Sequence, residues 1–233
     1  MIITGGNGFI GSALARQMPK AEVWNRESGT IYPTDVLIHM AASTHLAIGY
    51  DRSVIEDNIV LANRVAESGF SRLVYASSSA IHNPNNLYAY SKMYAEELFK
   101  PFNSTGLRYY TVYGPNDIGV VGKLIDCALN DKPFNIYGGL QIRDFVYIDD
   151  VVKATIDSIE SKEKIIEVGT GVGLNIIELR FMIEELTGKK INCHFLPPYD
   201  FEAQESICPT PLKQFTALEE GRKKTIEWHL QKK

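Results

Sequence analysis

The sequence predicts an α/β fold in which a doubly wound parallel sheet carries helices on both faces. The first observation behind this prediction is the start of the chain, where a short apolar strand beginning at Ile2 leads into a glycine-rich turn and a helix over residues 12–18. The second is the alternation that follows, because runs of strand length and stretches of helical apolar spacing take turns along most of the 233 residues. Such alternation is typical of parallel sheets whose strands are joined by helices.

The glycine-rich turn contains Gly5, Gly8 and Gly11, each three residues from the next. A strand-to-helix turn that holds a dinucleotide needs glycine for a backbone conformation that a Cβ would strain, for close approach to a pyrophosphate, and for packing of the helix on the strand. The free N–H groups at the start of the helix then face the phosphates. The alternative is a plain strand–turn–helix without a ligand, which the strand before the turn and the helix after it make less favoured.

Composition and charge suit one large globular domain, or one domain with a small lobe. Hydrophobic residues make up 45% of the chain and charged residues 22%, and the net charge of −4 provides no basic surface for nucleic acid. The three cysteines are scattered, so they indicate neither a metal site nor a disulfide framework. The chain opens directly into a strand and has no long apolar run, so we expect no membrane partner and a cytoplasmic setting.

The second predicted strand, residues 21–25, ends at Asn25 and Arg26. An acidic residue at this position usually holds the adenosine ribose. Asn25 can still hydrogen-bond a ribose hydroxyl, and Arg26 can instead pair with a 2′-phosphate, because a guanidinium suits phosphate. The choice between NAD and NADP therefore stays open here, as does a solvated turn without a ligand.

The third predicted strand, residues 35–42, ends in the small residues Ala41 and Ala42. Small side chains at the carboxyl end of a strand let a ligand lie across it, and open α/β sheets bind ligands at that end. We expect His39, in the same strand, to be a packed residue rather than a base. A helix is predicted over 53–68 from its apolar spacing, and Gly69 is its stop signal.

The next predicted strand, residues 72–79, ends in three serine hydroxyls, and a helix follows from Tyr88 to about Lys100. Tyr88 and Lys92 are four residues apart, so they share one face of that helix. A Tyr-x-x-x-Lys pair means little by itself in a chain with 12 tyrosines. The position of this pair, one helix after the serine-ended strand, is what indicates a site.

Further strands are predicted over 106–115, 134–137, 165–168 and 191–195, and further helices over 120–130, 175–186 and 216–230. Asp149 and Asp150 are expected to be acids at a helix N-terminus rather than catalytic groups. We expect residues 1–115 to form the dinucleotide-binding part, with a helix over 149–160 and the strand over 165–168 returning to it. Residues 116–233 are expected to form mainly a small C-terminal substrate-binding lobe.

Together, these motifs resemble the extended short-chain dehydrogenase/reductase superfamily in its NAD-dependent epimerase/dehydratase branch, which includes UDP-glucose 4-epimerases. Several motifs in the family's order are much more specific than one alone. They cover residues 4–11, 39–42, 77–80, 88–92, 107–115, 143–150, 168–171, 218–221 and 225–228. The resemblance implies a Rossmann-like fold, a nucleotide-sugar substrate, NAD as the cofactor with NADP as an alternative, no metal, and a homodimer formed through the helices over 53–68 and 88–100.

The resemblance also implies roles for individual residues. Tyr88 is the implied acid/base on a sugar hydroxyl, Lys92 its activator and a ribose ligand, Ser79 a second hydroxyl contact to the substrate, and Arg143 a ligand of the substrate phosphates. Because a nearby cation favours a phenolate, Lys92 and the oxidised nicotinamide are expected to lower the pKa of Tyr88. The alternative for Arg143 is a structural ion pair with a neighbouring Asp. The implied cofactor-binding residues are Gly5, Gly8, Phe9, Ile10, Gly11, Asn25, Arg26, Ala41, Ala42, Asn58, Ser77, Tyr88 and Lys92.

Three departures from the family's pattern shorten this chain. Only eight residues separate Ser79 from Tyr88, residues 25–35 are too few for the usual extra strand and helix beside the adenine, and residues 199–215 lack the usual second arginine. Dehydratases of this branch carry an Asp-Glu pair after the strand hydroxyls, whereas Ala80 follows Ser79 here, which disfavours dehydration and decarboxylation. The favoured function is a nucleotide-sugar 4-epimerase. The alternatives are an NADP-dependent keto-sugar reductase and a non-catalytic dinucleotide-sensing module.

Overall fold

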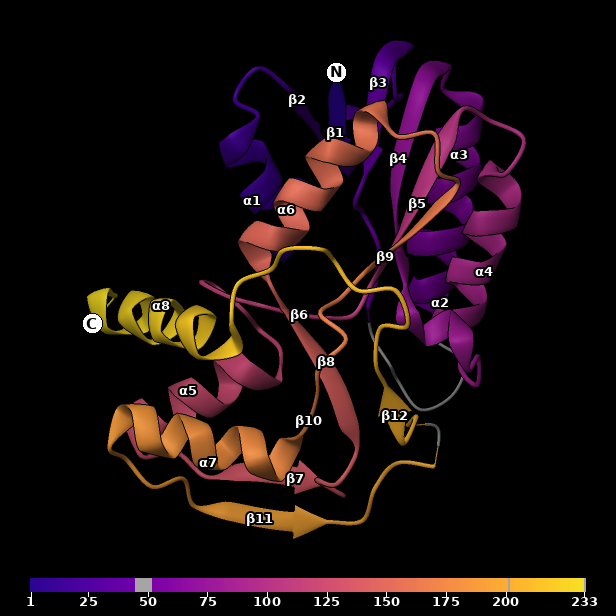
Figure 1. Ribbon diagram of the computed structural model, residues 1–233. Helices are drawn as coiled ribbons and strands as arrows, with labels where there is room; N and C mark the ends of the chain where they lie inside the picture. The colour runs from indigo at the N-terminus through magenta and orange to yellow at the C-terminus, as the bar shows by residue number, and fades with distance from the viewer. Residues whose placement is uncertain (45–51, 201, 233) are drawn as a thin grey trace. The chain divides into compact units, whose positions relative to one another are not determined.

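A computed structural model of the chain describes residues 1–44, 52–200 and 202–232. The chain divides into two compact units, the first formed by residues 1–109 and 151–167 and the second by residues 110–150 and 168–233. Each unit has its own sheet structure and its own buried side chains, and Figure 1 labels the elements of both.

The first unit is built on one six-stranded sheet. Its strands are β1 (Ile2–Thr4), β2 (Glu22–Trp24), β3 (Thr34–His39), β4 (Phe70–Ser78), β5 (Ser104–Tyr109) and β9 (Ile165–Val168), in the order β2-β1-β3-β4-β5-β9. The pairs β1–β2, β1–β3, β3–β4 and β4–β5 are all parallel. Because the chain moves outward from β1 in both directions, the sheet is doubly wound, as the sequence predicted.

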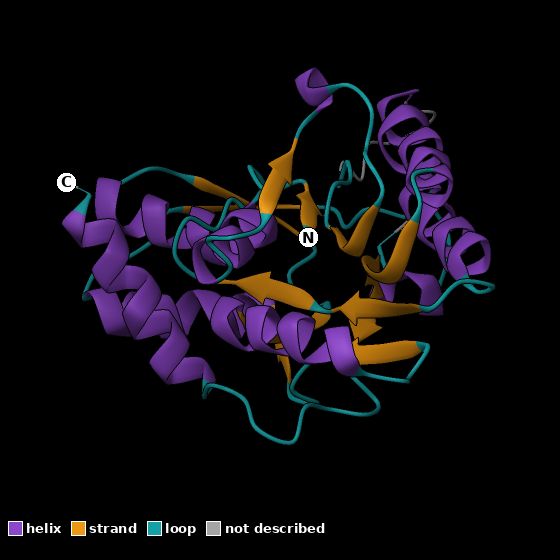
Figure 2. Ribbon diagram, turned by 90° about the horizontal axis from the view of Figure 1, so that it is seen from above, coloured by secondary structure: helices purple, strands orange, loops and turns teal. Residues whose placement is uncertain are grey.

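The helices of the first unit are α1 (Phe9–Gln17), α2 (Arg52–Val54), a π-helical segment (Ile55–Val60), α3 (Leu61–Glu67) and α4 (Leu87–Phe99), and α6 (Ile148–Asp157) enters it from the second unit. α1 begins at Phe9 rather than at the predicted residue 12, because Gly8 is extended and serves as its N-cap. The helix predicted over 53–68 is present with a π-helical middle, which apolar spacing does not reveal. Helices lie on both faces of the sheet, with α3 and α4 on one side and α1 on the other (Figures 1 and 2).

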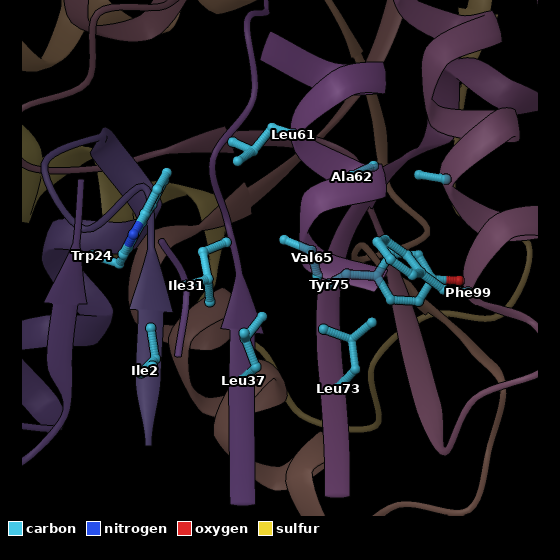
Figure 3. Close-up of a cluster of buried hydrophobic side chains, with 11 residues drawn as sticks. Ile2, Trp24, Ile31, Leu37, Leu61, Ala62, Val65, Leu73, Tyr75 and Phe99 are labelled. Atoms are coloured by element: carbon cyan, nitrogen blue, oxygen red, sulfur yellow. The ribbon is translucent and has the colours of Figure 1, made fainter. Parts of the chain in front are cut away.

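Burial on both faces follows from the alternation of side chains along each strand. Leu37 and Ile38 are neighbours in β3 and point to opposite faces, yet both are 0% exposed. On one face, Leu37, Leu73 and Tyr75 pack with Val65 of α3 and Phe99 of α4 in a buried cluster that Figure 3 shows. This packing fixes α4, and with it the residues on its first turns, against the sheet.

The second unit is organised around β8. Its strands are β6 (Thr111–Tyr113), β7 (Phe134–Tyr137), β8 (Ile142–Tyr147), β10 (Gly173–Asn175), β11 (Cys193–Leu196) and β12 (Glu205–Ser206), and its helices are α5 (Val120–Asn130), α7 (Ile176–Thr187) and α8 (Leu218–Gln231). β8 pairs with β6 and β12 in parallel and with β10 antiparallel, while β7 and β11 form a separate parallel pair. The single strand predicted over 106–115 is wrong, since β5 and β6 join different sheets. An apolar run does not show which strand pairs with each half.

A buried carboxylate, Asp144 of β8, ties the second unit together. Its oxygens accept hydrogen bonds from the backbone N–H groups of Thr170, Gly171 and Cys208 at 2.8–3.1 Å. Asp150, an acid of the first turn of α6, accepts from Thr216 N at 2.7 Å and from the Thr216 hydroxyl. Both carboxylates satisfy backbone donors of this unit, which is a structural role.

Candidate functional site

The glycine-rich turn between β1 and α1 uses its glycines in different ways. Gly5 has a φ of +72°, and a Cβ on it would lie 2.5 Å from the backbone nitrogen of Ala41. A Cβ on Gly11 would overlap the carbonyl oxygen of Gly5. Gly8 has an ordinary φ of −77°, and the nearest atom to its Cβ would be Gly5 O at 3.2 Å. The fold itself therefore requires Gly5 and Gly11, whereas a Cβ at Gly8 would make one tight contact with a backbone oxygen, which a small shift relieves.

A pocket of about 290 Å³ lies over this turn in the first unit. It includes six of the residues implied as cofactor ligands, together with side chains that we did not predict. The lining consists of Gly5, Gly6, Asn7, Gly8, Trp24, Asn25, Arg26, Met40, Ala41, Ala42, Asp57 and Leu61. Phe9, Ile10 and Gly11 continue from the turn into the first turn of α1, where no side chain caps the helix. Free N–H groups beside a pocket of this kind suit the pyrophosphate of a dinucleotide.

Two other implied cofactor ligands, Asn58 and Ser77, have side chains bonded within the unit. Asn58 is buried, and its amide accepts from Ser43 N at 2.7 Å and donates to Ser43 O and to Ser91 Oγ. Ser77 Oγ donates to Glu96 Oε1 at 2.5 Å. These side chains brace the strand ends and helices around them, and a direct contact of either with a cofactor stays a prediction.

Tyr88 and Lys92 lie on the first turns of α4, whose N-cap Asn86 accepts a hydrogen bond from Ala89 N at 2.9 Å. The Lys92 ammonium is 5.7 Å from the centre of the Tyr88 ring, so the helix brings the pair together as its spacing predicts. Lys92 Nζ donates to the carbonyl oxygen of Ala76 in β4 at 2.9 Å. That bond ties the lysine to the strand that ends in the serines.

Ser78 is the serine whose hydrogen bond acts on the pKa of Tyr88, and the expected contact of Ser79 with the substrate stays a prediction. Burial raises the pKa of Tyr88, and a side-chain hydrogen bond with Ser78 acts in the opposite direction. Ser78 is the last residue of β4, and Ser79 begins the 3-10 turn Ser79–His82. Both serines therefore lie at the carboxyl end of β4, where the strand and the 3-10 turn contact α4.

Burial of the Lys92 ammonium at this site costs free energy. Burial lowers the pKa of Lys92 to about 8 from the ordinary 10.5. The expected lowering of the Tyr88 pKa by Lys92 is not among the effects that act on that phenol, where burial is the largest. The ammonium is bonded to a backbone carbonyl instead.

A partly buried ion network holds the 3-10 turn Ser79–His82 at the end of β4. Arg108 of β5 forms two hydrogen bonds with Glu96 of α4, at 2.7 and 2.9 Å, and a third with Glu167 of β9 at 3.0 Å. Glu167 also bonds His82 Nε2 at 3.0 Å, at the end of the turn. The network is built from residues that the sequence reading did not single out, because their partners are far apart in the chain.

Arg143, the implied phosphate ligand, belongs to β8 in the second unit. Its guanidinium donates to Glu202 Oε1 at 2.8 Å and to its neighbour's carbonyl, Ile142 O, at 2.8 Å. Arg143 is therefore in an ion pair, although its acid is Glu202 rather than the adjacent Asp144. Its role toward a substrate phosphate stays a prediction.

Within residues 1–44, 52–200 and 202–232, no cluster of three or more His, Cys, Asp or Glu side chains is placed to hold a metal ion. In the same residues, no helix is both long and apolar enough to cross a membrane.

The chain combines a parallel doubly wound sheet, a glycine-rich turn that leads into a helix, and a Ser–Tyr–Lys set at the end of β4 and the start of α4. Together these features define a Rossmann-type enzyme of the extended short-chain dehydrogenase/reductase kind. More narrowly, the chain belongs to the NAD dependent epimerase/dehydratase family, whose model matches residues 20–169. This confirms the resemblance drawn from the sequence, and the cofactor of the family is NAD.

Three known proteins illustrate the likeness. UDP-glucuronate 4-epimerase of Thermodesulfobacterium geofontis is 28% identical over 84% of this chain and 73% of its own. UDP-N-acetyl-alpha-D-glucosaminuronate decarboxylase of Bacillus cytotoxicus is 26% identical over 97% of this chain and 96% of its own. The solved structure of MoeE5 in complex with UDP-glucose and NAD superimposes with a TM-score of 0.89 at 24% identity, covering 99% of this chain and 98% of that one. The alignment with the decarboxylase extends over 309 positions against 233 residues here, which is consistent with shortened loops.

Proposed function

We propose that the protein is an NAD-dependent nucleotide-sugar epimerase that inverts the configuration at C4 of the sugar. The observation that carries this proposal is the set Ser78, Tyr88 and Lys92 at the carboxyl end of β4 and on the first turns of α4, where no carboxylate stands in the turn that follows the serines. A hydroxyl acid/base with no accompanying carboxylate suits the removal and return of a single proton.

The residues of the glycine turn fit a dinucleotide. Gly8 puts no side chain between the main chain and the pocket, and no side chain caps the first turn of α1. Ala41 and Ala42 line the pocket with small side chains at the end of β3. We propose that Gly5–Gly11 hold the pyrophosphate and that Ala41 and Ala42 lie under the cofactor. When bound, NAD supplies reversible hydride transfer at C4.

The chain's own residues then handle the proton. Tyr88 takes the proton of the C4 hydroxyl and returns it after the sugar has turned over, and Ser78 steadies the phenolic oxygen through its hydrogen bond. Burial raises the pKa of Tyr88, so the phenol needs positive charge nearby to act as a base. Lys92 is the side chain that brings such charge to the ring.

Elimination and decarboxylation are less well supported. Ala80, Ile81 and His82 follow the serines, so the turn offers no acid pair. Glu167, the carboxylate that reaches this turn, is bonded to Arg108 and His82. A carboxylate so engaged is a poor proton acceptor for an eliminating sugar.

We propose that the second unit binds the nucleotide diphosphate through Arg143, since a guanidinium pairs with phosphate. The Glu202 carboxylate now bonded to Arg143 would have to give way to that ligand. We also propose a homodimer that pairs through α4 and the 52–67 helical stretch, and a cytoplasmic setting, which the odd number of three scattered cysteines favours.

The test is an assay of epimer interconversion with UDP-glucose, UDP-glucuronate and their C4 epimers. Products are separated by chromatography while the absorbance of reduced nicotinamide is recorded. The proposal expects both epimers from either starting sugar, without net consumption of cofactor. Stoichiometric oxidation of reduced cofactor with a keto sugar would indicate the reductase instead. Tight cofactor binding without turnover on any of these sugars would indicate the sensing module.

A further inference from the structure

The carboxyl end of β2 lacks the acidic residue that usually binds the adenosine ribose at this position. Asn25 stands there, and its Oδ1 accepts hydrogen bonds from Ser28 N and Ser28 Oγ, both at 3.0 Å. These bonds cap the 3-10 turn Arg26–Ser28. The Asn25 side-chain oxygen is therefore already hydrogen-bonded within its own turn. Recognition of the ribose hydroxyls then falls to another group in the pocket.

A carboxylate from a different element lines the same pocket. Asp57 belongs to the π-helical segment Ile55–Val60, more than 30 residues after β2, and lies at the pocket with the glycine turn and Asn25. Its Oδ1 accepts a hydrogen bond from Nη2 of Arg26, which also lines the pocket. The Asp57 side chain is 24% exposed and that of Arg26 is 66% exposed. The cation best suited to a 2′-phosphate is thus already paired with an acid.

We propose that Asp57 sets the preference of this site for NAD over NADP. The inference rests on the proposed binding of the dinucleotide in this pocket. The 2′-phosphate of NADP carries between about one and a half and two negative charges at neutral pH. A partly buried carboxylate repels that charge more strongly than one in open water, and it keeps Arg26 neutralised. The 2′-hydroxyl of NAD brings no charge and can donate to a carboxylate oxygen.

The position of Asp57 explains how a shortened chain keeps this selectivity. Residues 25–35 form only a 3-10 turn and the start of β3, so the usual extra strand and helix beside the adenine are missing. The π-helical segment widens the helix locally, and it carries Asp57 to the pocket while Asn58 points into the protein and bonds Ser43 and Ser91. Adjacent residues of one helix thereby serve the ligand and the core.

The experiment is calorimetric titration of NAD and NADP into the wild-type protein and into Asp57→Asn, which keeps the shape of the side chain and removes its charge. We expect the wild type to prefer NAD. In Asp57→Asn, the ratio of the two dissociation constants should move toward NADP by about tenfold or more. Glu56→Gln is the matched control, because Glu56 is the neighbouring acid, pairs with Arg52 and is absent from the pocket lining. It should leave the ratio unchanged.

Arg26→Ala separates the two members of the pair. In the wild-type background it should change the ratio of the two dissociation constants little, because the Arg26 guanidinium is already paired with Asp57. In the Asp57→Asn background it should remove most of the gained NADP affinity, because the released Arg26 is then the phosphate ligand. A double-mutant cycle measures this coupling.

The outcomes are distinguishable from those of the proposed function. If NAD binds and Gly8→Val abolishes that binding, but Asp57→Asn leaves the ratio unchanged, only this inference is overturned. A wild-type preference for NADP overturns it as well. If the wild type binds neither dinucleotide, the proposed function fails together with it. Asp57→Ser provides the same comparison if the amide variant does not fold.

Discussion

Gly8 differs from Gly5 and Gly11 in the contacts that a side chain at its position would make. A Cβ at Gly5 or Gly11 would overlap backbone atoms of the protein, whereas one at Gly8 would make a tight contact with the backbone oxygen of Gly5 at 3.2 Å. Gly5 and Gly11 therefore belong to the folding of the turn. We propose that Gly8 is glycine because the cofactor lies against it.

We expect Gly8→Val to fold and to lose cofactor binding, because its side chain would occupy the place of the pyrophosphate. Gly11→Val is the matched control for the fold, and it should lower the midpoint of thermal unfolding, because its side chain overlaps Gly5. Calorimetric titration of NAD and a thermal melt of both variants provide the measurement. Unchanged NAD affinity in a folded Gly8→Val protein would show that the pocket is not the cofactor site.

Ser78 and Ser79 form a pair that mutation can separate. Ser78 bonds Tyr88, so we expect Ser78→Ala to lower the turnover rate by about 10²-fold or more, as loss of a group supporting acid–base catalysis does. Ser79→Ala should have the smaller effect. Tyr88→Phe sets the reference for complete loss of the acid/base. Steady-state kinetics on a C4 epimer pair decides the order, and a larger loss in Ser79→Ala would restore the sequence-based assignment.

Lys92 is expected to support turnover and, because its ammonium is buried, to lower the stability of the folded protein. The folded pKa of about 8 lies below the unfolded 10.5, so between these values the unfolded chain binds more protons and stability rises with pH. Below pH 8 the folded protein carries the full cost of a buried ammonium. Lys92→Met should therefore raise the free energy of unfolding at pH 7 by up to about 3 kcal/mol.

The same substitution should reduce turnover, and if Lys92 acts on the Tyr88 phenol once the cofactor is bound, it should also raise the apparent pKa of the activity profile. Denaturant unfolding at pH 7 and at pH 10.5 checks the stability, and the gain should vanish at the higher pH. A variant less stable than the wild type at pH 7 would contradict the cost assigned to the buried ammonium.

At the scale of elements, α4 has two distinct faces. One face carries Ala95 and Phe99 into the core cluster. The other shows Tyr90, Met93 and Tyr94 at 53%, 39% and 38% exposure, and Val60 of the neighbouring π-helical segment at 49%. Residues three and four apart line one side of a helix, so these side chains make an exposed apolar strip.

We expect this strip to be the dimer surface. Light scattering at micromolar concentration should give about twice the 26.1 kDa mass of the chain, and Met93→Glu should return it to the monomer mass by placing a charge in the apolar contact. Phe181→Glu, at a 51% exposed position of α7 in the second unit, is the matched control and should leave the dimer intact. A wild-type monomer would contradict the proposal.

At the scale of the molecule, we expect the response of stability to acid to depend on His39, the last residue of β3 in the first unit's sheet. Its side chain is buried and bonds Thr4 Oγ1 at 2.7 Å. Burial, helped by the charge of Lys92, lowers the pKa of His39 from 6.5 to about 3. The role of a packed residue that the sequence suggested for His39 agrees with this burial.

His39 binds a proton near pH 6.5 in the unfolded chain but only near pH 3 in the folded chain. The contribution of His39 to stability should therefore be complete above pH 6.5 and should be lost as the pH drops toward 3. The expected loss is up to about 1.4 kcal/mol for each unit of pH in that window. His39→Gln should flatten this part of the curve. Urea unfolding followed from pH 7.5 to 4 measures it, and equal slopes in the two proteins would contradict the argument.

The sequence by itself determined the features that depend on near neighbours in the chain. The glycine spacing in 5–11, the apolar runs of the strands and the Tyr88–Lys92 interval all report local backbone geometry. These patterns were sufficient for the doubly wound sheet, for the family and for the faces of α4.

The tertiary structure decided which distant groups meet. It placed Ser78 beside Tyr88, brought Asp57 to Arg26 across 31 residues, paired Arg143 with Glu202 and divided the segment 106–115 between two sheets. Spacing along the chain reveals the face of one helix or strand, because that face depends on a local period. The partner of a side chain depends on how separate elements pack, and no local period records that.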